Sequence, residues 1–161
     1  MHTYEKLWSE DGPRNYPVSD TDVFTCAEDV VAKASLWPLM GRATCPEVWH
    51  LDPVGHYVCG WTASSLCTLT GWAEDPSELH THLRYTRLDG CTHDRWIIVD
   101  SRPTGDSTRP PVSEADAAAY RRIRTILRHQ GIDLLDAVVF DDEQRWWSLR
   151  ELTSGTTDWQ E

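Results

Sequence analysis

The sequence lacks the features that would place it at once in a familiar class of protein. No apolar run approaches the roughly 20 residues of a membrane-spanning helix, and the polar N-terminus is unlike a signal peptide. Phosphate-binding loops, dinucleotide glycine fingerprints and nucleophile elbows are also missing. These absences predict a cytoplasmic protein with no membrane partner, and they exclude the commonest nucleotide-binding and hydrolase motifs.

Cysteine pairs are missing as well. The cysteines form no Cys-x-x-Cys motif and are odd in number: Cys26, Cys45, Cys59, Cys67 and Cys91. A zinc knuckle needs ligand pairs at a characteristic spacing. We therefore expect these side chains to be small buried hydrophobes in a reducing compartment.

Positive charge is scarce. The 15 lysines and arginines stand against 26 acidic residues, which gives a formal net charge of −11. This excess argues against binding to a nucleic-acid backbone. It leaves open a basic protein partner, or a role as an acidic inhibitor or DNA mimic from a mobile element. A homo-oligomer is compatible with the sequence, which does not specify the oligomeric state.

The length of 161 residues, the nine tryptophans and the 40% hydrophobic content predict one packed domain. We divide the chain into an N-terminal extension (1–18), a domain (19–152) and a loose, polar C-terminal tail (153–161). Hydrophobic periodicity predicts an α/β (α+β) fold in which helices flank a mixed β-sheet. The expected elements are a helix capped by Thr25 and Glu28, a hairpin at 47–62, a short strand at 66–70, a helix from Asp75-Pro76, buried neighbouring strands at 95–100 and 134–140, a helix at 113–130 and a last strand at 145–149.

The most informative stretch is the loop Asp100-Ser-Arg-Pro-Thr-Gly-Asp106. It follows a buried strand and precedes Ser113-Glu-Ala-Asp116 at the start of the longest helix. This order resembles RadC-type domains of the JAB/MPN (JAMM) metalloprotease superfamily, where a buried strand runs into His-x-His-Pro-x-Gly-Asp and Ser-x-x-Asp opens the next helix. The matching positions are Pro103, Gly105, Asp106, Ser113 and Asp116. The resemblance implies a JAB/MPN (cytidine-deaminase-like) sandwich.

Two C-terminal motifs extend this likeness. The segment Gly131-Ile-Asp-Leu-Leu-Asp136 is similar to the Gly-Ile-x-Leu-Leu-Asp of RadC-type domains, and Ser148-Leu-Arg-Glu151 is similar to their closing motif. The likeness covers residues 19–152 and is strongest from residue 96 onward.

In that family, two histidines and the aspartate bind a catalytic zinc, a glutamate activates water and the serine supports the oxyanion. The resemblance makes Asp116 the remaining ligand and Ser113 the remaining oxyanion donor. Asp100 and Arg102 stand at the histidine positions, and an arginine has no lone pair to give a metal. The glutamate is expected near 56–70, yet none occurs from Val48 to Ala73.

The resemblance therefore implies a catalytically degenerate domain, a pseudoenzyme that binds or scaffolds a protein partner without a cofactor. In this interpretation Arg102 fills the metal's place and neutralises Asp100 and Asp116. Alternatively, Arg102 points into solvent, and Ser113 and Asp116 only cap a helix.

A divergent zinc-dependent metalloprotease or isopeptidase of the JAB/MPN type is the alternative function, with His80 or His82 as an unorthodox ligand. Residues two apart on a helix point in different directions, which argues against one metal shared by that pair. The pair Trp146-Trp147 lies on an expected strand, so the two rings should face opposite sides. Whichever ring is exposed is a candidate contact for a partner.

Overall fold

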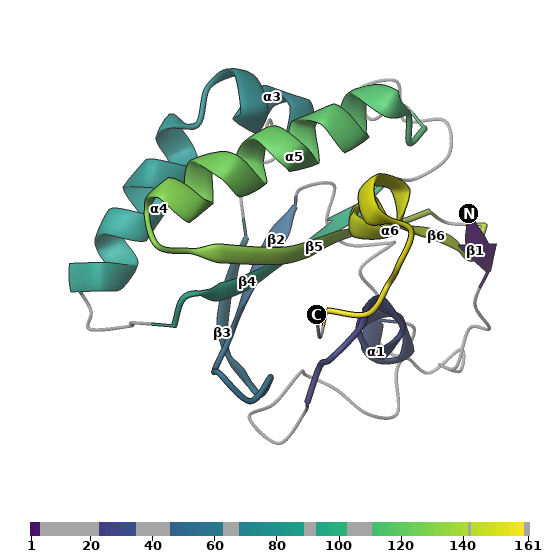
Figure 1. Ribbon diagram of the computed structural model, residues 1–161, viewed down its shortest axis with the longest axis horizontal. Helices are drawn as coiled ribbons and strands as arrows, with labels where there is room; N and C mark the ends of the chain where they lie inside the picture. Colours follow the sequence, from purple (N-terminus) through teal and green to yellow (C-terminus); the bar gives the residue numbers. More distant parts are fainter. Residues whose placement is uncertain are drawn as a thin grey trace.

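The computed structural model describes residues 1–3, 23–34, 46–62, 68–88, 93–102, 111–141 and 143–159. In these residues a six-stranded mixed sheet lies between helices (Figure 1). Helices α3, α4 and α5 cover one face of the sheet, and α1 lies on the other face. No helix in this part of the chain is long and apolar enough to cross a membrane.

The strands are ordered β1-β6-β5-β4-β2-β3 across the sheet. Only the central pair β4 and β5 is parallel; the other neighbours are antiparallel. The strands are β1 His2–Thr3, β2 Glu47–Leu51, β3 Tyr57–Thr62, β4 Arg95–Ser101, β5 Asp133–Phe140 and β6 Arg145–Ser148. The helices are α1 Ala27–Ala34, α3 Leu69–Glu74, α4 Ser77–Leu88, α5 Glu114–His129 and α6 Leu149–Ser154.

Most of the expected elements are confirmed. The hairpin at 47–62 forms, the last strand pairs with β5, and the apolar strands β4 and β5 lie side by side at the centre, buried along nearly their whole length. Alternate residues of β4 supply two separate cores: Ile98 packs beneath α5, and Ile97 packs on the α1 face. The long helix α5 begins and ends within one residue of its expected bounds.

The short strand expected at 66–70 is wrong for the described part of that segment. Thr68 instead accepts a hydrogen bond from the Gly71 amide and caps α3. Leu69, Trp72 and Ala73 are then buried at helical spacing against the sheet. A short apolar run suits a strand or a helix equally well, and the cap decides between them. Residues 63–67 lie outside the described part.

The ends of the chain differ from expectation in two ways. At the start of α1, Asp29 rather than Glu28 accepts the hydrogen bonds of the Thr25 amide and hydroxyl. The expected loose tail is instead packed as far as Trp159, which is buried and donates its amide to the Thr25 carbonyl. Asp158 also forms an isolated antiparallel β-bridge with Cys26. The segment that precedes α1 and the one that follows α6 therefore hold each other in place.

Candidate functional site

The end of β4 brings two charged residues into the interior. Asp100 faces the α5 side of the sheet, as Ile98 does two residues earlier. Arg102 follows the strand, and its amide donates to the Phe140 carbonyl at the end of β5 (2.8 Å). Only 1% of Asp100 and 7% of Arg102 are exposed. The local sequence thus places a cation and an anion under the start of α5.

The Arg102 guanidinium bridges two aspartates. Its Nε donates to Asp100 Oδ2 at 3.0 Å. Its Nη1 and Nη2 donate to the two carboxylate oxygens of Asp116, at 2.9 and 2.6 Å. The expected convergence of these residues is therefore confirmed, and the interpretation in which Arg102 points into solvent is wrong.

This cluster consists of one cation and two anions in a nearly dry environment. Burial alone lowers the pKa of Arg102, but the hydrogen bonds and charges of Asp116 and Asp100 outweigh it and raise the pKa overall. Arg102 therefore keeps its proton. The paired, bidentate geometry is the arrangement in which arginine binds carboxylate most strongly.

Asp116 has a second task, because it also caps α5. Its Oδ2 accepts the Ser113 amide at 2.9 Å, while the Ser113 hydroxyl lies 3.5 Å away. The helix-capping interpretation of Ser113 and Asp116 is confirmed alongside the ion pair. Ser113 is exposed. The residues Pro103, Gly105 and Asp106, which carry part of the family resemblance, lie outside the described residues.

The residues of this cluster do not fit a zinc ion. A catalytic zinc site takes three side chains with lone pairs and leaves one position open. Here a guanidinium donates hydrogen bonds into the space between Asp100 and Asp116, and it has no lone pair to offer. Within the described ranges, His, Cys, Asp and Glu side chains form no group of three that could hold a metal.

A buried glutamate, Glu47, stands directly before the glutamate-free stretch Val48–Ala73 and outside the window 56–70 in which the water-activating group was expected. Glu47 opens β2, is 9% exposed and accepts a hydrogen bond from Trp49 Nε1. It pairs across the sheet with Val99, so it shares the α1 face with that residue. Asp100 is the next residue of β4 and points to the opposite face. The sheet therefore separates Glu47 from the arginine cluster.

A second group of polar side chains lies under α4, where His82, one of the candidate ligands, meets His50, a contact that the sequence analysis did not predict. The His50 ring stacks on Trp96 at 4.6 Å, and the His82 ring stacks on Trp61 at 3.5 Å between centroids. Desolvation lowers the pKa of both histidines to about 4. Both are therefore neutral at pH 7.

The two candidate ligands His80 and His82 lie in different surroundings. His82 is held among the tryptophans, whereas His80 lines an open hollow with Arg84, Arg87 and Gln130. His82 lies 6.1 Å from Trp96, between ring centroids. Asp100 is four residues further along β4, or about 13 Å at strand spacing. The structure therefore does not bring His82 to the aspartates.

The two adjacent tryptophans face opposite sides of the sheet, as expected. Trp146 is buried on the α1 face and stacks on His2 at 4.3 Å. Trp147 is half-buried against the core on the α5 face, and the Arg145 guanidinium lies 5.8 Å from its ring centre. Of the two, Trp147 is the one that reaches the surface. Cys26 and Cys59 are half-buried rather than fully buried.

No protein-family model matches this chain, and no curated protein matches it.

Proposed function

We propose that this protein is a catalytically inactive domain of RadC/JAB type that acts as a protein-binding or scaffolding module. One observation carries the proposal: the Arg102 guanidinium fills the space between Asp100 and Asp116, the positions that the resemblance assigns to metal ligands. The order of the buried strand β4 and a helix opened by Ser113 also supports the resemblance. The JAB/MPN sandwich belongs to this proposal.

Hydrolysis is absent from the proposed function for a physical reason. An internal ion pair satisfies the carboxylates, so they are not available to bind a metal, and Glu47 lies on the other face of the sheet. The divergent metalloprotease would need a histidine beside Asp116, and His80 and His82 lie elsewhere.

The test restores the ligand set. In an Asp100→His, Arg102→His variant, two imidazoles and Asp116 would form a three-ligand site. We expect one zinc ion per chain in isothermal titration, with no peptidase activity. Adding Asp116→Asn should abolish binding, whereas adding His80→Ala and His82→Ala should leave it intact. A folded double variant that binds no zinc would show that these positions do not correspond to the family's site.

The binding role has its own test at Trp147. We expect Trp147→Ala to lose a protein that co-purifies with the unmodified chain from its native cells. Tyr85→Ala is the control, because Tyr85 is an exposed aromatic residue on α4, away from β6. Equal co-purification with both variants would remove Trp147 from the interface.

A further inference from the structure

A concave pocket lined by arginines lies between α5, α6 and the start of β5. Its volume is about 420 Å³, which is within the range of small-molecule sites. Its lining consists of Arg124, Arg128, Gly131, Ile132, Asp133, Arg150 and Trp159. Three arginines and a single acid give this lining a formal charge of +2, in a chain whose net charge is −11.

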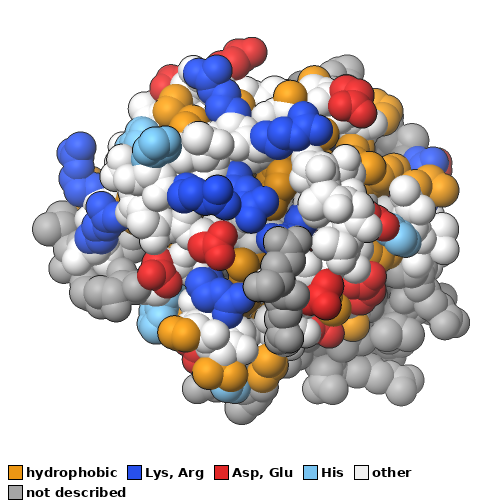
Figure 2. Space-filling view, viewed as in Figure 1, with side chains coloured by type: hydrophobic (Ala, Val, Ile, Leu, Met, Phe, Trp, Pro, Cys, Tyr) orange, Lys and Arg blue, Asp and Glu red, His pale blue; other side chains and the backbone are white. Residues whose placement is uncertain are grey.

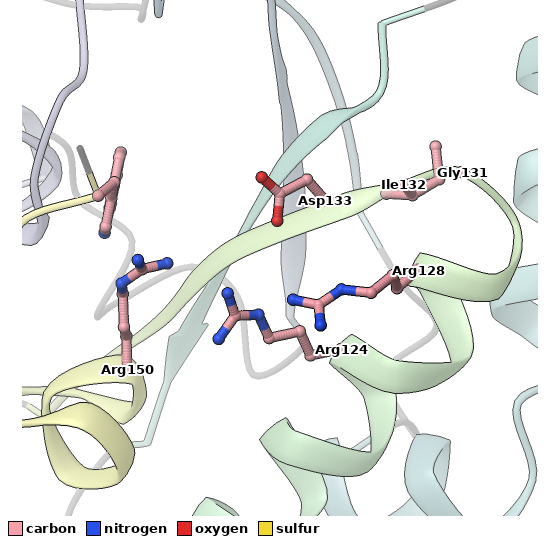
Figure 3. A pocket seen from close by; sticks show the side chains of 7 residues that line it. Arg124, Arg128, Gly131, Ile132, Asp133 and Arg150 are labelled. Carbon is pink, nitrogen blue, oxygen red and sulfur yellow. The ribbon is translucent and has the colours of Figure 1, made fainter. Parts of the chain in front are cut away.

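The three arginines occupy graded depths. Arg150 is 3% exposed and forms the floor, Arg124 is half-buried in the wall, and Arg128 is exposed at the rim. In Figure 3 the guanidinium groups of Arg124 and Arg128 extend from α5 toward Arg150 on α6. Three cationic groups from two helices thus line one space, although like charges repel.

The floor is held by a β-bulge in β5. The register with β4 shifts between Trp96 and Ile97, which leaves Leu135 as the extra residue. The Leu135 carbonyl accepts hydrogen bonds from Tyr120 Oη at 3.1 Å and from Arg150 Nη1 at 3.1 Å. The guanidinium of Arg150 is therefore fixed before any ligand arrives, which lowers the entropic cost of binding.

Asp136 fixes the remaining wall. This carboxylate accepts hydrogen bonds from the Arg150 amide at 3.0 Å, the Trp159 indole at 3.1 Å and the Ser148 hydroxyl at 2.7 Å. It thereby ties α6 to the segment that carries Trp159. The Trp159 ring, of which 5% is exposed, is thereby fixed beside the arginines.

The wall and rim arginines are not paired with carboxylates of the described residues. Within the described residues neither Arg124 nor Arg128 forms an ion pair, and Arg124 Nε is buried without a hydrogen-bond acceptor. A simpler explanation is that cations complement the C-terminal dipole of α5, and it applies to Arg128 in the last turn. It does not explain Arg124, one turn earlier, because two like charges at this spacing destabilise a helix.

We infer that this pocket binds a small phosphate monoester, with the phosphate on the arginines and its organic group at the exposed edge of Trp159. The +2 lining matches the charge of a phosphate dianion. Arginine forks bind phosphate oxygens in pairs. Figure 2 shows the same face of the molecule, where Lys and Arg side chains gather across the centre. The inference does not depend on the RadC/JAB resemblance.

The test is titration of the full chain with a nucleoside monophosphate, inorganic phosphate and acetate. The readouts are calorimetry and the NMR shift of the Trp159 indole N–H. We expect one-to-one binding with a Kd on the order of 1 mM or tighter for the monophosphate, weaker binding of phosphate, and the weakest binding of acetate.

Two variants locate the site. Arg128→Gln, at an exposed position that tolerates substitution, and Arg124→Gln with Arg128→Gln should bind about tenfold or more weakly, since each loses charged hydrogen bonds. Arg121→Gln with Arg122→Gln removes equal charge from the same helix outside the pocket and should bind normally. Equal loss in both double variants, or no saturable binding, would overturn the inference. Tighter binding of a phosphoserine peptide than of the monophosphate would overturn the small-ligand assignment.

Discussion

At the scale of single residues, Arg102 decides what the candidate site can do. The same position could hold a metal ligand or a cation, but not both. A buried cation between two carboxylates is stable only while all three charges are present. The site should therefore be sensitive to the loss of any one of them.

Replacing Arg102 with Met tests this dependence. The variant keeps the apolar stem but leaves Asp100 and Asp116 facing each other, so we expect a loss of ~3–5 kcal/mol in the free energy of unfolding. Urea denaturation at pH 7 measures it. Arg121→Met, at an exposed position on α5, should change stability by less than about 0.5 kcal/mol. Similar small losses in both would mean that the cluster is not a buried ion pair in solution.

Asp136 predicts an unusual pH dependence. Burial raises its pKa to about 6 despite the hydrogen bonds it accepts, from an ordinary value of 3.8. The folded state therefore binds more protons than the unfolded state between these pH values, so this group's contribution to stability falls as pH rises from about 4 to about 6. Relative to Asp136→Asn, the free energy of unfolding of the unmodified protein should fall by on the order of 3 kcal/mol over this pH window. Urea denaturation of both proteins at several pH values checks it, and a constant difference would contradict it.

At the scale of elements, the parallel pair β4 and β5 forms the centre of the molecule. It separates the two cores and carries Asp100 at one end and the bulge at the other. Parallel strands buried on both faces are continuous in apolar residues, and both strands have this composition. Their packing should dominate stability.

Substitution of Ile98 by Ala tests the central strand. The side chain is fully buried beneath α5, so we expect a loss of ~2–5 kcal/mol. Val58→Ala on the edge strand β3 is the matched control, because Val58 is 38% exposed. Chemical denaturation that showed less than about 0.5 kcal/mol for Ile98→Ala would be inconsistent with a central buried strand.

Local sequence rules were sufficient for elements whose signals are themselves local. The capping residues of α5, the alternation at Trp146-Trp147 and the apolar runs of β4 and β5 each lie within a few adjacent residues. The bridge from Arg102 to Asp116 was one of two interpretations that the segment Asp100–Asp106 and the resemblance left open. α3 was mistaken for a strand, because six residues are too few for periodicity to distinguish the two.

The arginine pocket and the histidine cluster were beyond such rules. Arg124, Arg150 and Trp159 come from three segments that meet only through the β5 bulge and the Asp136 hydrogen bonds. His50 and His82 likewise meet only when α4 packs on the sheet. No spacing in the chain encodes these contacts.

At the scale of the whole molecule, low pH should destabilise the folded state through the histidine cluster under α4. Desolvation holds the pKa of His82 near 4, below its ordinary 6.5. Between these pH values the unfolded state therefore binds more protons than the folded state. This contribution to stability is complete above pH 6.5 and is lost as pH falls toward 4. His82→Phe keeps the stacking on Trp61 and removes the titration. Denaturation from pH 7 to 4 should show a smaller loss in the free energy of unfolding for the variant than for the unmodified protein. An equal pH dependence in both proteins would refute the neutral, desolvated histidine.

The central claim is that Arg102 occupies the position that a catalytic metal would need. The most direct measurement is the metal content of the unmodified protein, purified from cells grown with added zinc and analysed by mass spectrometry. The account predicts far less than one zinc per chain, with the same result for Asp116→Asn. One full equivalent of zinc that is lost on Asp116→Asn would contradict it.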